Sequence, residues 1–126
     1  MKKLMKNAFI WETYEKLEKA FEDTSAIFPV KINYYILVNK QELFNKYTII
    51  EKMRQDIGRK YGTYDGKLMV YNIPEDKREI AQSELTQLLE IDQSVEISIC
   101  SLKDLEGLEI SMQQMEAILF MIEKEE

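Results

Sequence analysis

Acidic side chains are the groups best placed to do chemistry in this 126-residue sequence, because histidine is absent and cysteine occurs once. Histidine is the commonest general base and transition-metal ligand, so its absence excludes Ser-His-Asp and Cys-His catalysis. With Cys100 as the one thiol, a structural zinc site lacks nitrogen and sulfur ligands. The four glycines form no phosphate-binding loop of a known kind. We therefore expect no cofactor and no metal.

Carboxylates can still work with a divalent metal, as they do in many nucleases. Such a site needs acids on adjacent strands. The clearest predicted strand, residues 95–100, carries only Glu96, and the residue two positions later is Ser98 where a restriction nuclease would have lysine. Acids that follow Pro74 lie at a predicted helix start, where the helix dipole explains them. We therefore expect a protein that is not an enzyme, with a metal-dependent nuclease as a lesser alternative.

The net charge of −6 is spread unevenly along the chain. Residues 30–62 carry seven basic residues and three acids, whereas residues 63–126 carry five basic residues and fifteen acids. Two interpretations stay open: the two halves are simply solvated or face each other, or the acidic half binds a basic partner. The second interpretation predicts partner contacts at Glu75, Asp76, Glu79, Glu84, Glu90 and Asp92.

A basic cluster marks the end of the most positive segment, where it is accompanied by tyrosines. Basic and aromatic side chains together can hold single-stranded nucleic acid. The strongly acidic remainder of the chain would repel phosphates, so we do not expect nucleic-acid binding and keep it as a second lesser alternative. The residues concerned are Lys52, Arg54, Arg59, Lys60, Tyr61 and Tyr64.

One long helix over residues 29–62 organises the predicted fold. Pro29 suits its first turn, and Gly62 suits a left-handed position just past its end. Asn39 falls on its apolar stripe, where a buried amide would fix the register against a neighbour. Gly58 would allow a close approach or a bend. The stripe recurs at helical spacing through Ile32, Ile36, Asn39, Leu43, Ile50, Met53 and Ile57.

The N-terminal part predicts a helix over residues 7–23 with Asn7 as its N-cap. Its apolar stripe is Ile10, Tyr14, Leu17 and Phe21, and Trp11 beside it is expected at the edge of the core. The short link over residues 23–28 would make this helix an antiparallel neighbour of the long one.

The C-terminal half predicts strands over residues 67–73 and 95–100, a helix over 74–90, and a very short strand over 107–110. Ser111 and Gln114 form a capping-box pattern for a last helix. Residues 123–126 would trail into solvent. The apolar face of the last helix is expected at Met112, Met115, Leu119 and Ile122.

These elements predict one α+β domain over residues 1–126. An antiparallel helical hairpin with one long central helix is joined by a small two- or three-stranded sheet and two further helices. A chain of this length can bury a core without disulfides, and Cys100 is expected to be a buried apolar residue in a reducing compartment. No apolar run reaches the length of a membrane span, and the N-terminus predicts no signal peptide.

The order of several short motifs resembles a group of small phage and prophage proteins of Gram-positive bacteria. The resemblance covers nearly the whole chain. Because its motifs are structural, it implies a shared fold without catalytic residues, and a place in the bacterial host cytoplasm. The motifs are Lys6-Asn7, Phe28-Pro29-Val30-Lys31, Asn39, Arg54, Tyr61-Gly62, Asp65-Gly66, Glu84, Leu88-Leu89, Val95-Glu96-Ile97, Leu105, Leu108-Glu109-Ile110-Ser111 and Phe120-Met121-Ile122.

The resulting hypothesis is a phage-encoded, non-catalytic protein-binding module. It would inhibit or modulate a host protein, such as one that handles nucleic acid or defends against phage, through the acidic surface. The alternative is a virion or assembly protein that self-associates through its long helix.

Overall fold

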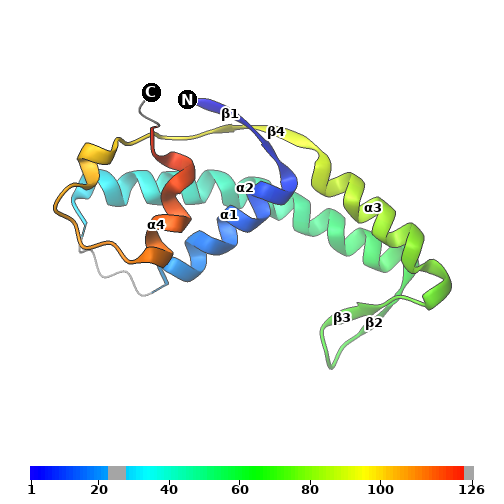
Figure 1. Cartoon of the computed structure of the whole chain (residues 1–126). Helices are drawn as coiled ribbons and strands as arrows, with labels where there is room; N and C mark the ends of the chain where they lie inside the picture. The colour runs from blue at the N-terminus through cyan, green and yellow to red at the C-terminus, as the bar shows by residue number, and fades with distance from the viewer. Residues whose placement is uncertain (23–27, 124–126) are drawn as a thin grey trace.

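A computed structural model of the chain describes residues 1–22 and 28–123. Its centre is the predicted helical hairpin, in which α1 (Asn7–Ala20) packs beside the much longer α2 (Val30–Tyr61) (Figure 1). The end of α1 is earlier than predicted, because Phe21 already leaves the helical conformation with φ −119° and ψ 24°. The predicted link over residues 23–28 and the tail beyond residue 123 lie outside the described residues, except for Phe28.

The two ends of α2 differ from prediction in detail. Pro29 is the residue before the helix rather than its first residue. Gly62 is extended, with φ −135° and ψ −178°, so the predicted left-handed conformation is wrong. Glycine is required there for a different reason: a Cβ at position 62 would meet the backbone oxygen of Asn72 at 2.6 Å. The 32 residues of α2 span about 48 Å.

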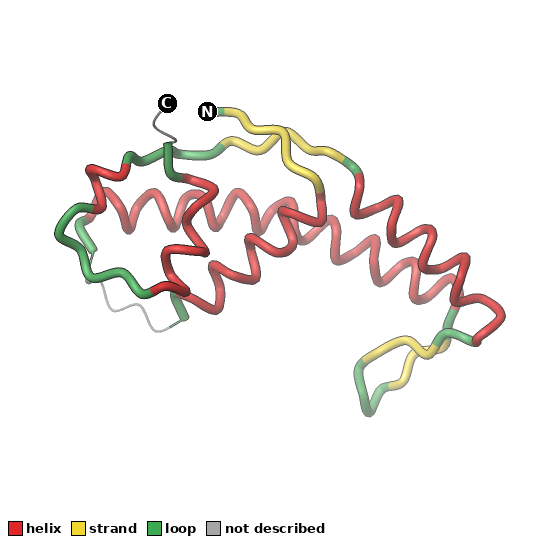
Figure 2. Tube along the Cα trace, in the orientation of Figure 1, coloured by secondary structure: helices red, strands yellow, loops and turns green. Residues whose placement is uncertain are grey.

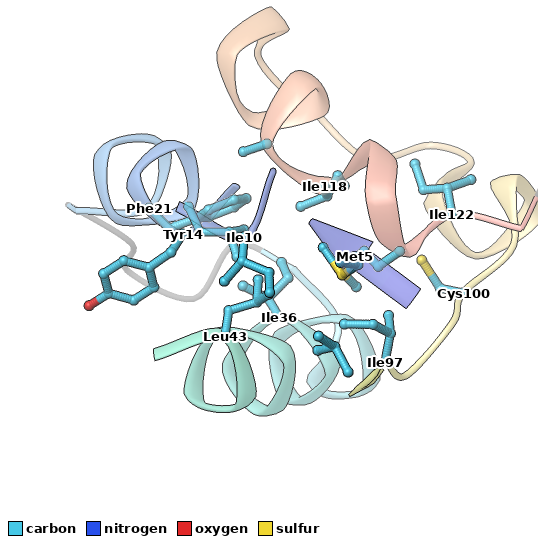
Figure 3. Close-up of a cluster of buried hydrophobic side chains, with 14 of the residues drawn as sticks. Met5, Ile10, Tyr14, Phe21, Ile36, Leu43, Ile97, Cys100, Ile118 and Ile122 are labelled. Carbon is cyan, nitrogen blue, oxygen red and sulfur yellow. The ribbon is translucent and has the colours of Figure 1, made fainter. Parts of the chain in front are cut away.

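The hydrophobic core lies along the first two thirds of α2. The buried face of α2 packs against α1, and α4 packs against α1, so that side chains of all three helices join one cluster that includes Ile10, Leu43 and Ile118 (Figure 3). Met53 was predicted on this face but is 46% exposed, because the core ends near Ile50. Trp11 is half-buried at the core edge, as predicted, with its ring centroid 4.5 Å from that of Tyr47.

Asn39 is fully buried and confirms the predicted role of a buried amide that meets a neighbour. Its Nδ2 donates to the backbone oxygen of Ser98 at 2.9 Å, and its Oδ1 accepts from the backbone N–H of Ser98 at 2.7 Å. This pair of hydrogen bonds fixes the extended segment after residue 96 against α2. Asn39 therefore lies on the buried face of α2, as its position on the apolar stripe predicted.

The N-terminal residues form β1 (Lys2–Lys6), which the sequence did not indicate, and it pairs antiparallel with β4 (Asp92–Glu96). The predicted strand over residues 95–100 therefore begins earlier and ends earlier. After it, only a single bridge joins Cys100 to Ile122. Asn7 is not the side-chain cap of α1; it is buried, and its Nδ2 donates to the backbone oxygen of Leu88 at 2.8 Å.

A second small sheet forms where only one strand was predicted. The strand expected over residues 67–73 is limited to β3 (Val70–Asn72), which pairs antiparallel with β2 (Thr63–Asp65). No strand forms over 107–110. The predicted single sheet is therefore two separate two-stranded antiparallel sheets, because the two regions lie far apart along α2 (Figure 2). The α+β class with one long helix is confirmed.

The remaining elements complete the two ends of the molecule. A 3-10 turn, η1 (Glu75–Lys77), leads into α3 (Arg78–Glu90), and η2 (Leu102–Leu105) precedes α4 (Met112–Ile118) and η3 (Leu119–Met121). The Ser111–Gln114 capping box is confirmed. The predicted apolar face is partly wrong: Met112 and Leu119 are exposed, whereas Ala117, Ile118 and Met121 are buried, because the helix tightens to a 3-10 turn after Ile118.

Candidate functional site

The last third of α2 extends beyond the core and forms a distal arm with α3, which runs back beside it (Figure 1). We define the distal arm as α2 from Glu51 onward, the β2–β3 hairpin, η1 and α3. The hairpin lies at the tip of this arm, at the far end from β1 and β4. Because the arm is thin, its side chains are more exposed than those of the core.

The hairpin is seated on α2 through one close contact. The ring of Tyr71 covers Gly58, where a Cβ would meet the Cδ2 atom of Tyr71 at 2.7 Å. Gly58 is buried beneath this ring, so the predicted close approach at Gly58 is confirmed. Tyr64 continues the contact, with its ring centroid 5.2 Å from that of Tyr71, and Arg59 Nε donates to the Tyr71 hydroxyl at 3.4 Å.

A groove of about 980 Å³ opens between α2, the hairpin and α3. Its size is in the range of sites that hold small ligands or a few side chains of a partner. Aliphatic and aromatic side chains form much of the lining, and Gln55, Asn72 and Gln82 add amide groups that can donate and accept hydrogen bonds. Other lining residues are Ile57, Gly58, Tyr64, Tyr71, Arg78 and Leu85.

The turn of the hairpin presents apolar side chains to solvent beside this groove. Leu68 is 68% exposed and Met69 is 76% exposed, and Met69 also lines the groove. The turn is held by Asp65, whose Oδ1 accepts from the backbone N–H groups of Lys67 and Leu68 at 2.9 and 3.3 Å. Met69 has a positive φ of 54°, which is uncommon outside glycine. A turn that is fixed by hydrogen bonds and exposes apolar side chains is typical of a contact surface.

The six acids predicted as partner contacts are not brought together in one patch. Glu75, Asp76 and Glu79 are exposed at the tip of the arm, in η1 and the first turn of α3, and Glu79 also lines the groove. Glu90 and Asp92 lie at the opposite end of α3, about 20 Å away along the helix.

Glu84 lies between these groups and has a partner within the chain. Its Oε1 accepts from Lys60 Nζ at 2.8 Å, and hydrogen bonds from Lys60 and Tyr61 lower the pKa of its carboxyl group. Another acid of the C-terminal half is used in the same way, since Asp104 pairs with Lys31 at 3.5 Å. The interpretation that oppositely charged parts face each other therefore holds for part of the acidic surface.

The basic cluster at the end of α2 is also largely paired. Arg54 donates to both oxygens of Glu51, at 2.8 and 3.1 Å, and this raises the pKa of the guanidinium group. Arg59 pairs with Asp56 at 3.2 Å, and Lys60 with Glu84. These pairs reduce the positive charge that the cluster offers to a phosphate backbone.

Cys100 is 2% exposed, and burial raises the pKa of its thiol, which agrees with the predicted apolar role.

Within residues 1–22 and 28–123, no group of three or more Cys, Asp or Glu side chains is arranged to hold a metal ion. Over the same ranges, no helix combines the length and the apolar character that crossing a bilayer needs.

Sequence reasoning missed the groove because its walls come from three separate segments. The signals were present: Gly58 inside a helix, and an Asp65-Gly66 pair between residues of strand-forming type, which is a hairpin pattern.

Comparison of the chain with protein-family models, with curated proteins and with solved structures finds no match. The resemblance to small phage proteins therefore stays a prediction.

Proposed function

We propose that this chain is a non-catalytic protein-binding module whose distal arm holds a basic partner protein. The observation that carries the proposal is the groove of about 980 Å³ beside the exposed, hydrogen-bonded turn at Leu68 and Met69. Interfaces commonly combine such an apolar anchor with a polar rim.

The chemistry of the arm indicates what the partner offers. Apolar side chains of the partner would lie in the groove against Tyr64 and Tyr71, and the partner's backbone amides would be within reach of the glutamines of the lining. Basic side chains beside it would meet the three acids at the tip, Glu75, Asp76 and Glu79. Complementary charge at a rim speeds association and selects the partner.

In its specific form, the proposal is a phage-encoded inhibitor or modulator of a bacterial host protein that acts in the host cytoplasm. A host protein that handles nucleic acid has a basic surface, and the exposed acids Glu75, Asp76 and Glu79 at the tip would contact that surface, although the arm as a whole is close to neutral. The support for this form is the charge of residues 63–126 and the motif resemblance.

The test is affinity capture from a lysate of a Gram-positive host with the full chain as bait. The tip variant combines Glu75→Lys, Asp76→Lys and Glu79→Lys, and the matched control combines Glu106→Lys, Glu109→Lys and Glu116→Lys, which are exposed acids outside the arm. We expect the unmodified chain and the control to capture the same protein, and the tip variant to lose about tenfold or more of it. Equal capture by both variants contradicts the proposal, as does capture that nuclease treatment abolishes.

A self-associating virion or assembly protein is the second candidate. Exposed apolar side chains of α2, such as Val30 and Leu37, favour it, because they lie outside the core of the single chain.

A further inference from the structure

The long helix α2 has two apolar faces: one is buried in the core, and the other is mostly exposed, with Phe44 at its end touching Tyr14 of α1 at 5.5 Å between ring centroids. The buried face holds Ile32, Ile36, Leu43 and Ile50. On the opposite side of the helix lies a second row, which we call the outer stripe. The outer stripe consists of Val30, Tyr34, Leu37 and Phe44, with exposed fractions of 86%, 60%, 66% and 42%.

The spacing of the outer stripe is that of helices that pair. From Val30 the steps are four and three residues to Tyr34 and Leu37, and the same steps lead through Gln41 to Phe44. An average of 3.5 residues per step keeps one face of a helix against another helix over several turns. We infer that the outer stripe binds a second copy of this chain, with the two α2 helices packed antiparallel along it.

The area of the outer stripe is sufficient for a modest interface. A fully buried aromatic side chain covers roughly 150–250 Å², and Tyr34 and Phe44 are 60% and 42% exposed, so with Val30 and Leu37 the stripe offers at most on the order of 500 Å² per copy. Two copies together reach on the order of 1,000 Å², which is near the lower bound for a specific contact. A contact between two identical stripes is also closed by two-fold symmetry, so it ends at a dimer.

The charges around the stripe favour the antiparallel arrangement. Lys31 is already paired with Asp104 at 3.5 Å, and Lys40 with Glu18 at 3.3 Å, which leaves amides such as Gln41 beside the apolar residues. Beyond Thr48 the same face carries the exposed Lys52 and Arg59. A parallel pair would bring these cations together, whereas an antiparallel pair directs the two distal arms away from each other.

The test is sedimentation of the full chain from low to high micromolar concentration, with two leucines of nearly equal exposure compared. We expect the unmodified chain to form dimers. Leu37→Glu, in the outer stripe, should raise the dissociation constant at least about tenfold, and Tyr34→Glu should act in the same direction. Leu4→Glu is the control, since Leu4 is 74% exposed but lies in β1, outside α2 and the distal arm, and it should change the constant less than about twofold. Circular dichroism checks that each variant is folded.

Three results would overturn the inference: an unmodified chain that is monomeric throughout, a dimer that Leu37→Glu leaves intact, or a dimer that Leu4→Glu weakens equally. The orientation of the two α2 helices is tested separately by the distance between spin labels attached at Lys52→Cys in the two copies. Because Cys100 is buried, we expect the label to attach at position 52. We expect about 40 Å for antiparallel helices, and roughly 10 Å would show a parallel pair. The outer stripe is separate from the groove, so a monomer would leave the partner-binding proposal untouched.

Discussion

The ring of Tyr71 lies against the backbone of Gly58, so close that a Cβ on residue 58 would meet its Cδ2 and Cγ atoms at 2.7 and 2.9 Å. This contact seats the hairpin on α2 and forms one wall of the groove. Everything proposed for the distal arm depends on it, because a detached hairpin would have no groove.

Gly58→Ala is therefore expected to lower stability. Alanine gains about 1 kcal/mol over glycine in a helix, but overpacking costs about 1–3 kcal/mol, and the atoms in the way are at the base of the ring, where they cannot swing aside. We expect a net loss on the order of 1 kcal/mol in urea unfolding. Gly66→Ala is the control, since its Cβ would meet no atom within 4 Å.

The same contact predicts that Gly58→Ala changes from destabilising to stabilising when Tyr71 is replaced by alanine. In a Tyr71→Ala chain the ring is gone, so Gly58→Ala should stabilise the protein by up to about 1 kcal/mol through helix propensity alone. If Gly58→Ala is destabilising in both backgrounds by the same amount, then Gly58 is required for a reason other than Tyr71.

Asn39→Ala should be among the most damaging single substitutions in α2. It removes both hydrogen bonds to the backbone of Ser98 and leaves the groups of Ser98 without the side chain that satisfies them. A loss of about 2–4 kcal/mol in the free energy of unfolding is expected. Asn45→Ala, on the exposed side of the same helix, should change it by less than about 0.5 kcal/mol. Similar values for the two would contradict the assigned role of Asn39.

The environment of the Tyr14 hydroxyl leads us to expect a lower free energy of unfolding at high pH. Burial, together with the hydrogen bond to Glu18 Oε1 at 2.8 Å, raises the pKa of Tyr14 to about 12 from 10.0. Because the folded state keeps this proton where the unfolded state loses it, the contribution is complete below pH 10 and falls as pH rises toward 12.

The magnitude of that loss is on the order of 2 kcal/mol. Urea unfolding at a series of alkaline pH values measures it, and Tyr14→Phe should remove this component of the pH dependence. Tyr34→Phe, at an exposed position, should leave the profile as it is in the unmodified chain. A pH profile that Tyr14→Phe does not alter would show that Tyr14 titrates alike in both states.

Ser111→Ala tests the helix start that both sequence and structure indicate. Ser111 Oγ accepts from the backbone N–H of Gln114 at 3.1 Å, and the Gln114 side chain accepts from the backbone N–H of Ser111 at 3.1 Å. Loss of such a cap costs about 1 kcal/mol. Ser83→Ala, an exposed serine inside α3, is the comparison and should be nearly neutral.

Local signals in the sequence were sufficient for the helices. Pro29, the spacing of Ile32, Ile36 and Leu43, and the Ser111 cap act within a few residues, so α2 and α4 begin where predicted to within one residue. Asn39 was identified because an amide on an apolar stripe needs a partner, although the partner, Ser98, lies 59 residues away.

Pairings between distant segments were not accessible in the same way. The strand β1 is stabilised by β4, about 90 residues later, and its own residues alternate over too few positions to indicate a strand. The groove depends on how α3 returns along α2, which no local pattern specifies. The sequence identifies the six acids of the predicted contact surface, but it does not show that they are divided between the two ends of α3. It also does not show that Glu84 forms an ion pair with Lys60.

The most direct measurement of the central claim is site-specific cross-linking in cells of a Gram-positive bacterium, the host that the proposed function names. A photo-reactive residue in place of Met69, which is 76% exposed beside the groove, should capture one partner protein. The same residue in place of Met112, which is 84% exposed at the start of α4, should not. Cross-links to one protein from position 112 and none from position 69 would contradict a binding function for the distal arm.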